Sequence, residues 1–113
     1  MVIELHQERD LEKLLERSHK EPVVIFKHST QCSRSADAYE EFQNFMAENP
    51  QTPCVTVLVI EDRGMSDELE DRFRIRHESP QAIVISNGVP VWHANHLNVT
   101  ARALEEVIEK QSH

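Results

Sequence analysis

One cysteine of this chain stands where a thiol could act as a nucleophile. Cys32 lies in the segment HSTQCSRS, residues 28–35, between a short apolar run and a stretch with helical periodicity. The first amide groups of a helix are unpaired, and the helix dipole is positive at that end. A thiol placed there can have its pKa lowered from about 8.5 into the range of about 3.5–7.5. The segment therefore predicts thiolate chemistry at Cys32.

Polar residues around Cys32 could tune this thiol or contact its ligand. Ser35 follows Cys32 by three residues, in the place where a dithiol protein carries its resolving cysteine, so the pattern is C-x-x-S. The guanidinium of Arg34 could favour the thiolate or hold a carboxylate. Ser33 and His28 are the remaining candidates for thiolate-modulating or ligand-binding residues. Alone the pattern is weakly specific, because serine is common at helix starts and arginine is usually solvated.

The elements that must position Cys32 follow from the spacing of apolar residues. Three- and four-residue steps predict helices over residues 8–17 and 33–47, and continuous β-branched runs predict buried strands over residues 23–27 and 54–60. A short strand is expected over residues 2–5. The later chain predicts a helix over residues 66–74 capped by Ser66, strands over 81–86 and 89–92 joined by Asn87-Gly88, and a helix capped by Thr100. This order predicts a single α/β domain over residues 1–113, with a mixed central sheet flanked by helices on both faces.

The composition excludes several classes of partner. The 113 residues include 12 basic and 20 acidic side chains, giving a net charge of -8, and the basic residues are scattered. We therefore expect neither nucleic acid nor an anionic membrane as partner. The first residues carry neither a basic region nor a long apolar stretch, so we expect a cytoplasmic protein. His93 and His96 are close in sequence, but no cysteine or carboxylate cluster accompanies them, so no metal site is expected.

The motifs together resemble a known family. The order strand, C-x-x-S at a helix start, strand, helix, Ser79-Pro80, strand and hairpin resembles the thioredoxin-fold oxidoreductases over nearly the whole chain. The segment FKHSTQCSRSA, residues 26–36, resembles the active-site segment of the monothiol bacilliredoxins, the YtxJ-like proteins of the bacillithiol system in low-GC Gram-positive bacteria.

The resemblance implies an activity and a site. Cys32 would attack the mixed disulfide of a bacillithiolated protein, free the protein thiol and carry bacillithiol until a second low-molecular-weight thiol or a reducing partner protein resets it. Bacillithiol would be a co-substrate, and no tightly bound cofactor is expected. Pro80 matches the cis-proline that lies opposite the active cysteine in this fold, and with Ser79 it would shape the substrate site.

Other interpretations stay open at this point. Cys54 begins a predicted buried strand, where a thiol is usually inert, yet it is the only other candidate for a resolving thiol. The fold could instead serve as a non-enzymatic module that binds a partner protein through this site and its acidic surface. An iron–sulfur carrier of the monothiol glutaredoxin kind is disfavoured, because the C-G-F-S run of those carriers is absent. The protein substrates and the oligomeric state do not follow from the sequence.

Overall fold

A five-stranded sheet in the order β1-β3-β2-β4-β5 forms the centre of the molecule. The computed structural model describes residues 2–31 and 33–111, and the side chains of residues 2–4 and 34 lie outside this description. The strands are β1 (Val2–Glu4), β2 (Val23–His28), β3 (Cys54–Leu58), β4 (Gln81–Ser86) and β5 (Val89–Asn95). The helices are α1 (Glu8–Arg17), α2 (Ser33–Glu48), α3 (Arg63–Phe73) and α4 (Ala101–Gln111), and a 3-10 turn η1 (His96–Asn98) follows β5.

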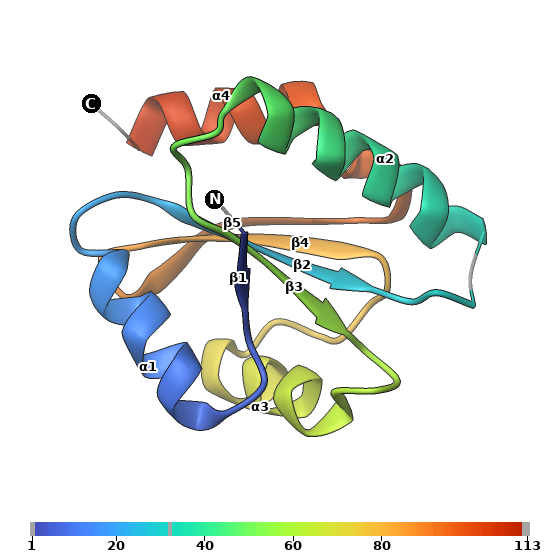
Figure 1. Cartoon of the computed structure of the whole chain (residues 1–113), viewed down its shortest axis with the longest axis horizontal. Helices are drawn as coiled ribbons and strands as arrows, with labels where there is room; N and C mark the ends of the chain where they lie inside the picture. Colours follow the sequence, from blue (N-terminus) through green and yellow to red (C-terminus); the bar gives the residue numbers. More distant parts are fainter. Residues whose placement is uncertain (1, 32, 112–113) are drawn as a thin grey trace.

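The strand directions bring four chain segments to one edge of the sheet. β2 runs parallel to β3, and β3 runs parallel to β1, whereas β2 with β4 and β4 with β5 are antiparallel. The carboxyl ends of β2, β3 and β5 and the amino end of β4 therefore meet at the same edge, on the right of Figure 1. We call this the thiol edge, because the chain segment with Cys32 follows β2 there.

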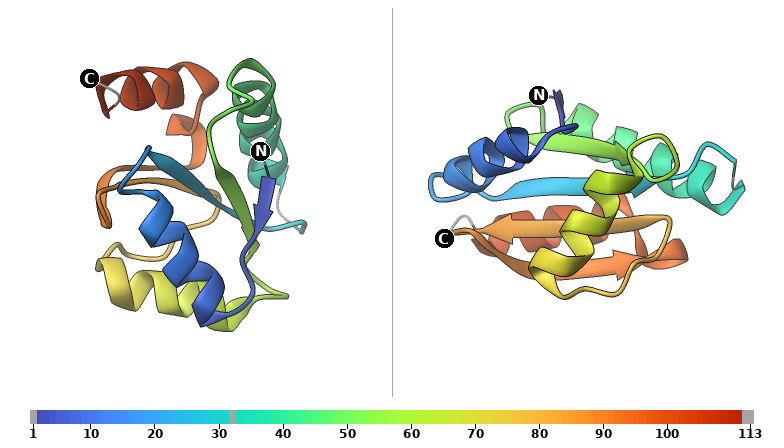
Figure 2. Two further views of the ribbon diagram at one scale, coloured as in Figure 1. Left: turned by 60° about the vertical axis from the view of Figure 1, so that its left-hand side comes forward. Right: turned by 90° about the horizontal axis from the view of Figure 1, so that it is seen from below.

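Two helices cover each face of the sheet (Figures 1 and 2). α1 and α3 bury Leu11, Leu14 and Leu69 against one face, and α2 and α4 bury Phe42 and Leu104 against the other. β2 lies in the middle of the sheet with every residue buried, which explains its continuous apolar run. The predicted α/β thioredoxin-like fold, a mixed sheet with helices on both faces, is confirmed.

Several element boundaries differ from the sequence prediction. β3 ends at Leu58 rather than residue 60, because the amide of Asp62 donates a hydrogen bond to the Leu58 carbonyl and turns the chain. α3 then begins at Arg63, so the predicted cap at Ser66 is wrong: Ser66 is a buried residue inside the helix. The cap at Thr100 is confirmed by its hydroxyl, which accepts the amide of Ala103 at 3.1 Å.

The hairpin between β4 and β5 has the predicted turn. Asn87 and Gly88 have φ angles of 54° and 80°, as a two-residue turn of the primed kind requires. β5 continues to Asn95, beyond the predicted end at residue 92. Among the described helices, none combines the length and the apolar character needed to cross a membrane.

Candidate functional site

The thiol segment joins β2 to α2 at the thiol edge. β2 ends at His28, and α2 begins at Ser33, directly after Cys32 in the sequence. Gln31 and Ser33 are both exposed. Cys32 itself and the side chain of Arg34 lie outside the described residues, so their predicted roles stay predictions. The start of α2 at Ser33 agrees with the sequence argument that a helix amino terminus adjoins this cysteine.

Ser35 is fully buried and ties the thiol segment to the end of β2. Its hydroxyl oxygen accepts the amide of Ser29 at 2.9 Å and lies 2.7 Å from Nδ1 of His28. A serine hydroxyl has one proton and two lone pairs, so it can accept from the amide and still pair with the imidazole. The fourth position of the C-x-x-S pattern is therefore filled by a hydroxyl that is held from two sides.

The His28 ring packs in a cluster with two other aromatic rings. Its ring stacks on Tyr39 of α2 with centroids 4.5 Å apart, and on Phe26 at 5.7 Å. Burial lowers the pKa of His28, and the nearby Glu61 carboxylate opposes this shift. The imidazole is therefore held in its neutral form near neutral pH, with one nitrogen as donor and the other as acceptor. His28 and Ser35 are separate candidates in the sequence, and the structure brings them into contact.

The Pro80 segment lies beside His28 at the thiol edge. The Ser79-Pro80 peptide bond is cis, as the resemblance implied. β2 and β4 pair Lys27 with Gln81, so Pro80 comes next along β4 toward His28. The Pro80 carbonyl accepts the amide of His96 at 2.9 Å, which ties this segment to the end of β5.

Three further side-chain contacts involve the same segment. His96 Nε2 lies 3.2 Å from a carboxylate oxygen of Glu78. The side-chain amide of Gln81 donates to the Arg76 carbonyl and to Asn95 Oδ1, both at 2.9 Å. These contacts join the segment around Pro80 to the end of β5. Ser79, which precedes Pro80, has a buried hydroxyl with no hydrogen-bond partner within the part of the chain that the structure describes.

Comparison with known proteins agrees with this arrangement. The family model of the monothiol bacilliredoxin BrxC matches residues 3–104. The chain belongs to the monothiol bacilliredoxin family. A solved structure assigned as an oxidoreductase with a thioredoxin fold is 30% identical with a TM-score of 0.83, over 93% of this chain and 91% of that chain.

Two thioredoxin structures show the same architecture. The Schistosoma mansoni thioredoxin pre-protein is 27% identical with a TM-score of 0.73, over 97% of both chains. Fasciola hepatica thioredoxin is 18% identical with a TM-score of 0.74, over 96% of this chain and 97% of that chain. The family and its fold assign thiol–disulfide oxidoreductase chemistry to this bacilliredoxin.

The second cysteine of the bacilliredoxin lies far from the thiol edge. Cys54 is fully buried at the start of β3, where it pairs with Val24, whereas His28 pairs with Leu58 at the other end of the strand. Four residues of parallel strand span about 13 Å, and a disulfide needs Cα atoms within about 7 Å. Burial also raises the pKa of the Cys54 thiol to about 12. The structural role predicted for Cys54 agrees with both observations.

Lys27 is a buried polar residue that the sequence did not indicate. This lysine is fully buried next to the end of β2, and its Nζ has no hydrogen-bond partner among residues 2–31 and 33–111. In the sequence, its position at the end of an apolar run was the available signal that Lys27 is buried. A cavity of about 330 Å³ lies at the same edge, lined by Val59, Ile60, Arg63, Ser66, Asp67 and His77.

A metal centre has no support in the described part of the bacilliredoxin. Its histidine, cysteine and acidic side chains form no group of three or more that could hold a metal ion. His96 instead contacts Glu78, and His93 is exposed on β5.

Proposed function

We propose that this bacilliredoxin removes bacillithiol from protein mixed disulfides, with Cys32 as the nucleophile. The proposal depends most on Ser35. A dithiol oxidoreductase carries its resolving thiol at this position, whereas here a fully buried hydroxyl is held by Ser29 and His28. Among the described residues the other thiol, Cys54, lies at the opposite end of β3. A single attacking thiol suits the transfer of a small thiol from a protein.

The reaction is one thiol–disulfide exchange. The Cys32 thiolate forms a bond to the bacillithiol sulfur while the disulfide bond to the substrate protein breaks. The electron pair of that bond leaves with the protein sulfur, which takes a proton from water. One disulfide is lost and one is formed, so this step needs no further oxidant or reductant.

The neighbouring residues have supporting roles in this proposal. Ser35 and His28 fix the turn between β2 and α2, Ser33 and Arg34 occupy the first turn of α2, and Pro80 with Ser79 shapes the surface that meets the substrate. Arg34 would hold a carboxylate of the small thiol. A second low-molecular-weight thiol or a reducing partner protein would attack the Cys32 adduct and restore the thiolate. The reaction would take place in the cytoplasm, where thiols are kept reduced.

Intact-mass spectrometry tests the proposal. The wild-type protein, Cys32→Ser and Cys54→Ser are each incubated with a protein that carries one bacillithiol mixed disulfide. We expect the wild type and Cys54→Ser to gain one bacillithiol while the substrate loses it, and Cys32→Ser to remain unchanged. If the wild type gains no adduct, the proposal is wrong and a non-enzymatic interaction module becomes the better interpretation.

A further inference from the structure

A series of hydrogen bonds connects the end of β2 to the residue before Cys32. Ser35 Oγ lies 2.7 Å from Nδ1 of His28 and accepts the backbone amide of Ser29 at 2.9 Å. Ser29 Oγ in turn accepts the amide of Gln31 at 3.4 Å, the longest of these contacts. The series begins at a buried imidazole and ends at an exposed residue of the thiol segment. We call it the serine relay.

The surroundings of Ser35 determine the direction of the first hydrogen bond. Its hydroxyl is fully buried and has one proton and two lone pairs, of which one accepts the Ser29 amide. If Nδ1 of His28 donated a proton, the hydroxyl would accept twice and its own proton would have no acceptor among the described residues. A buried donor without an acceptor is unfavourable. Donation from Ser35 to an unprotonated Nδ1 avoids this, because the hydroxyl proton is then paired.

The surroundings of His28 favour the same arrangement. An acceptor at Nδ1 requires the neutral imidazole with its proton on Nε2. Burial lowers the pKa of His28 and so favours the neutral form, against the opposing effect of the Glu61 carboxylate. The ring stacks on Tyr39 of α2 and on Phe26 of β2. Packing thus fixes where Nδ1 lies, and burial keeps this nitrogen free of a proton near neutral pH.

We infer that His28 is a positioning residue of the thiol reaction: its unprotonated Nδ1 accepts the hydroxyl proton of Ser35, and the oriented hydroxyl holds the turn from Ser29 to Gln31. The inference deepens the proposed function and rests on it only for the identity of the nucleophile. His28 acts through Ser35, so this role involves no proton transfer and no contact between the imidazole and the sulfur. It fixes the backbone that leads into Cys32.

Two substitutions separate this hydrogen bond from packing. His28→Phe keeps an aromatic ring against Phe26 and Tyr39 but has no acceptor. His28→Asn has no ring but can place an amide oxygen at the branch where Nδ1 is attached. A role as acceptor predicts a disturbed relay in His28→Phe and its rescue in His28→Asn. A role in packing alone predicts the reverse.

NMR measures the relay without bacillithiol. In the wild type near neutral pH, the nitrogen chemical shifts of His28 should be those of an unprotonated Nδ1 and a protonated Nε2. Hydrogen exchange at the Ser29 amide should be about ten-fold faster in His28→Phe than in the wild type, and within about three-fold of the wild type in His28→Asn. Transfer from a bacillithiolated protein should slow about three- to ten-fold in His28→Phe, and less in His28→Asn, because the thiol segment is less well positioned.

His93→Phe is the matched control, because it makes the same chemical change at an exposed histidine of β5. We expect it to match the wild type in both measurements. A protonated Nδ1 in wild-type His28 would overturn the inference. Wild-type exchange at the Ser29 amide in His28→Phe, or equal acceleration in His28→Phe and His28→Asn, would also overturn it.

A second variant covers the case in which His28→Phe does not fold. Ser35→Ala removes the hydroxyl at the centre of the relay and should also accelerate exchange at the Ser29 amide, whereas an unchanged rate would contradict the inference. The NMR measurements can overturn the role of His28 while the exchange activity of Cys32 stands. Conversely, a wild-type protein that takes up no bacillithiol contradicts the proposed function and leaves the NMR result intact.

Discussion

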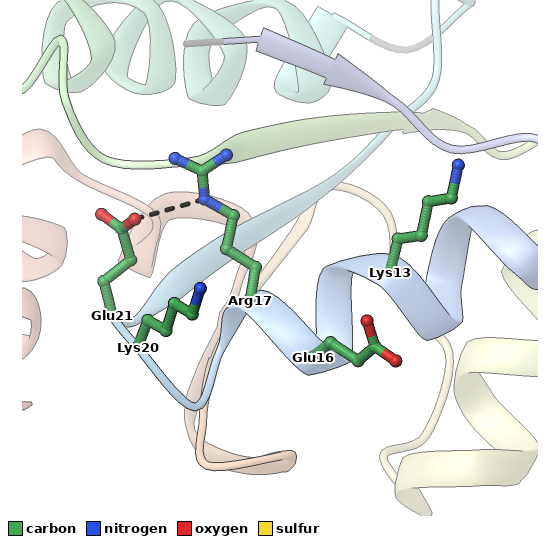
Figure 3. A pocket seen from close by; sticks show the side chains of 5 residues that line it. All are labelled: Lys13, Glu16, Arg17, Lys20 and Glu21. Carbon is green, nitrogen blue, oxygen red and sulfur yellow. Dashed lines mark hydrogen bonds and ion pairs between the residues drawn. The ribbon is translucent and has the colours of Figure 1, made fainter.

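The two ends of β2 differ in how they hold their polar groups. Near its amino end, a cavity of about 400 Å³ is lined by charged side chains of α1 and the following turn: Lys13, Glu16, Arg17, Lys20 and Glu21 (Figure 3). These side chains are exposed or half-buried, and Arg17 pairs with Glu21 at 3.2 Å. At the carboxyl end, the smaller cavity accompanies a buried lysine, a buried imidazole and a buried hydroxyl.

This difference shows that the burial of the polar groups distinguishes the two ends of β2. Charged side chains that remain in water have little effect on one another. Buried polar groups act through a low dielectric, and their burial lowers the stability of the fold unless another role offsets it. The same contrast separates the two cysteines, because Cys54 is enclosed by the apolar core near the amino end whereas Cys32 follows the carboxyl end.

The largest effect expected from this comparison concerns the two thiols. Cys32→Ser should reduce exchange with a bacillithiolated protein by more than about a thousand-fold, because it removes the nucleophile. Cys54→Ser should leave the rate within about two-fold and lower the free energy of unfolding by about 1–3 kcal/mol, since a hydroxyl would be buried in an apolar cluster. Exchange rates and urea unfolding measure the two effects. Formation of an internal Cys32–Cys54 bridge during turnover would contradict the assignment.

A smaller effect is expected where the hydroxyl at the thiol edge is replaced by a thiol. In Ser35→Cys, the new thiol can attack the mixed disulfide at Cys32, so the lifetime of the bacillithiol adduct should fall by about ten-fold or more. Time-resolved intact-mass spectrometry measures this lifetime. Ser35→Ala is the control, because it removes the same hydroxyl without adding a thiol. Equal lifetimes in Ser35→Cys and the wild type would show that position 35 does not approach the adduct.

The imidazole at the thiol edge should influence acid stability. Because burial lowers the pKa of His28 below 6.5, the unfolded chain binds a proton that the folded chain does not. The free energy of unfolding should therefore fall as the pH drops from about 6.5 through the folded-state pKa. His28→Phe, which keeps an aromatic ring against Phe26 and Tyr39, should reduce this slope in urea unfolding at pH 5–7.

His77 also has a pKa lowered by burial, so part of the slope should remain in His28→Phe. His93→Gln is a suitable control, since His93 is exposed on β5. A slope that is unchanged by His28→Phe, or reduced equally by His93→Gln, would show that the buried imidazole is not responsible.

The smallest effect concerns Arg34, on the first turn of α2. Bacillithiol carries carboxylates on its malate unit, and a guanidinium can bind a carboxylate through two hydrogen bonds. A partly exposed contact of this kind contributes about 1 kcal/mol and weakens at high salt. Arg34→Ala should therefore slow exchange with bacillithiol mixed disulfides several-fold, and exchange with an uncharged disulfide less. Equal slowing on both substrates would indicate that Arg34 acts on the thiolate instead.

Much of the fold could be predicted because the apolar spacing is regular. The continuous apolar run of β2 indicates a buried strand, and the three- and four-residue spacing of apolar residues in α2 indicates a helix. The Asn87-Gly88 pair predicted the hairpin. The start of α3 could not be predicted in this way. The turn at residues 58–62 depends on a backbone hydrogen bond, and the first residues of α3 show little apolar periodicity.

The sequence predicted which residues belong to the candidate site, but not which of them contact one another. Hydrogen bonds across the turn between β2 and α2 join Ser35 to His28, and the antiparallel pairing of β2 with β4 brings Pro80 beside them. Lys27 is the last residue of the run predicted as a buried strand, and in the structure β2 continues through His28 and Lys27 is fully buried. Sequence periodicity cannot show which helix will cover a strand end, so the burial of Lys27 required the structure.

The first residue of α4 is hydrogen-bonded to a side chain of α2. The carboxylate of Glu41 accepts the amide of Ala101 at 3.0 Å, and Phe42 and Leu104 share one apolar cluster. Separation of α2 from α4 would break this hydrogen bond and open the Ala101 amide to hydrogen exchange. We expect the two helices to open together in local unfolding, which would also release the start of α2. Slow exchange at an amide 69 residues away in sequence thus reports on the integrity of the thiol edge.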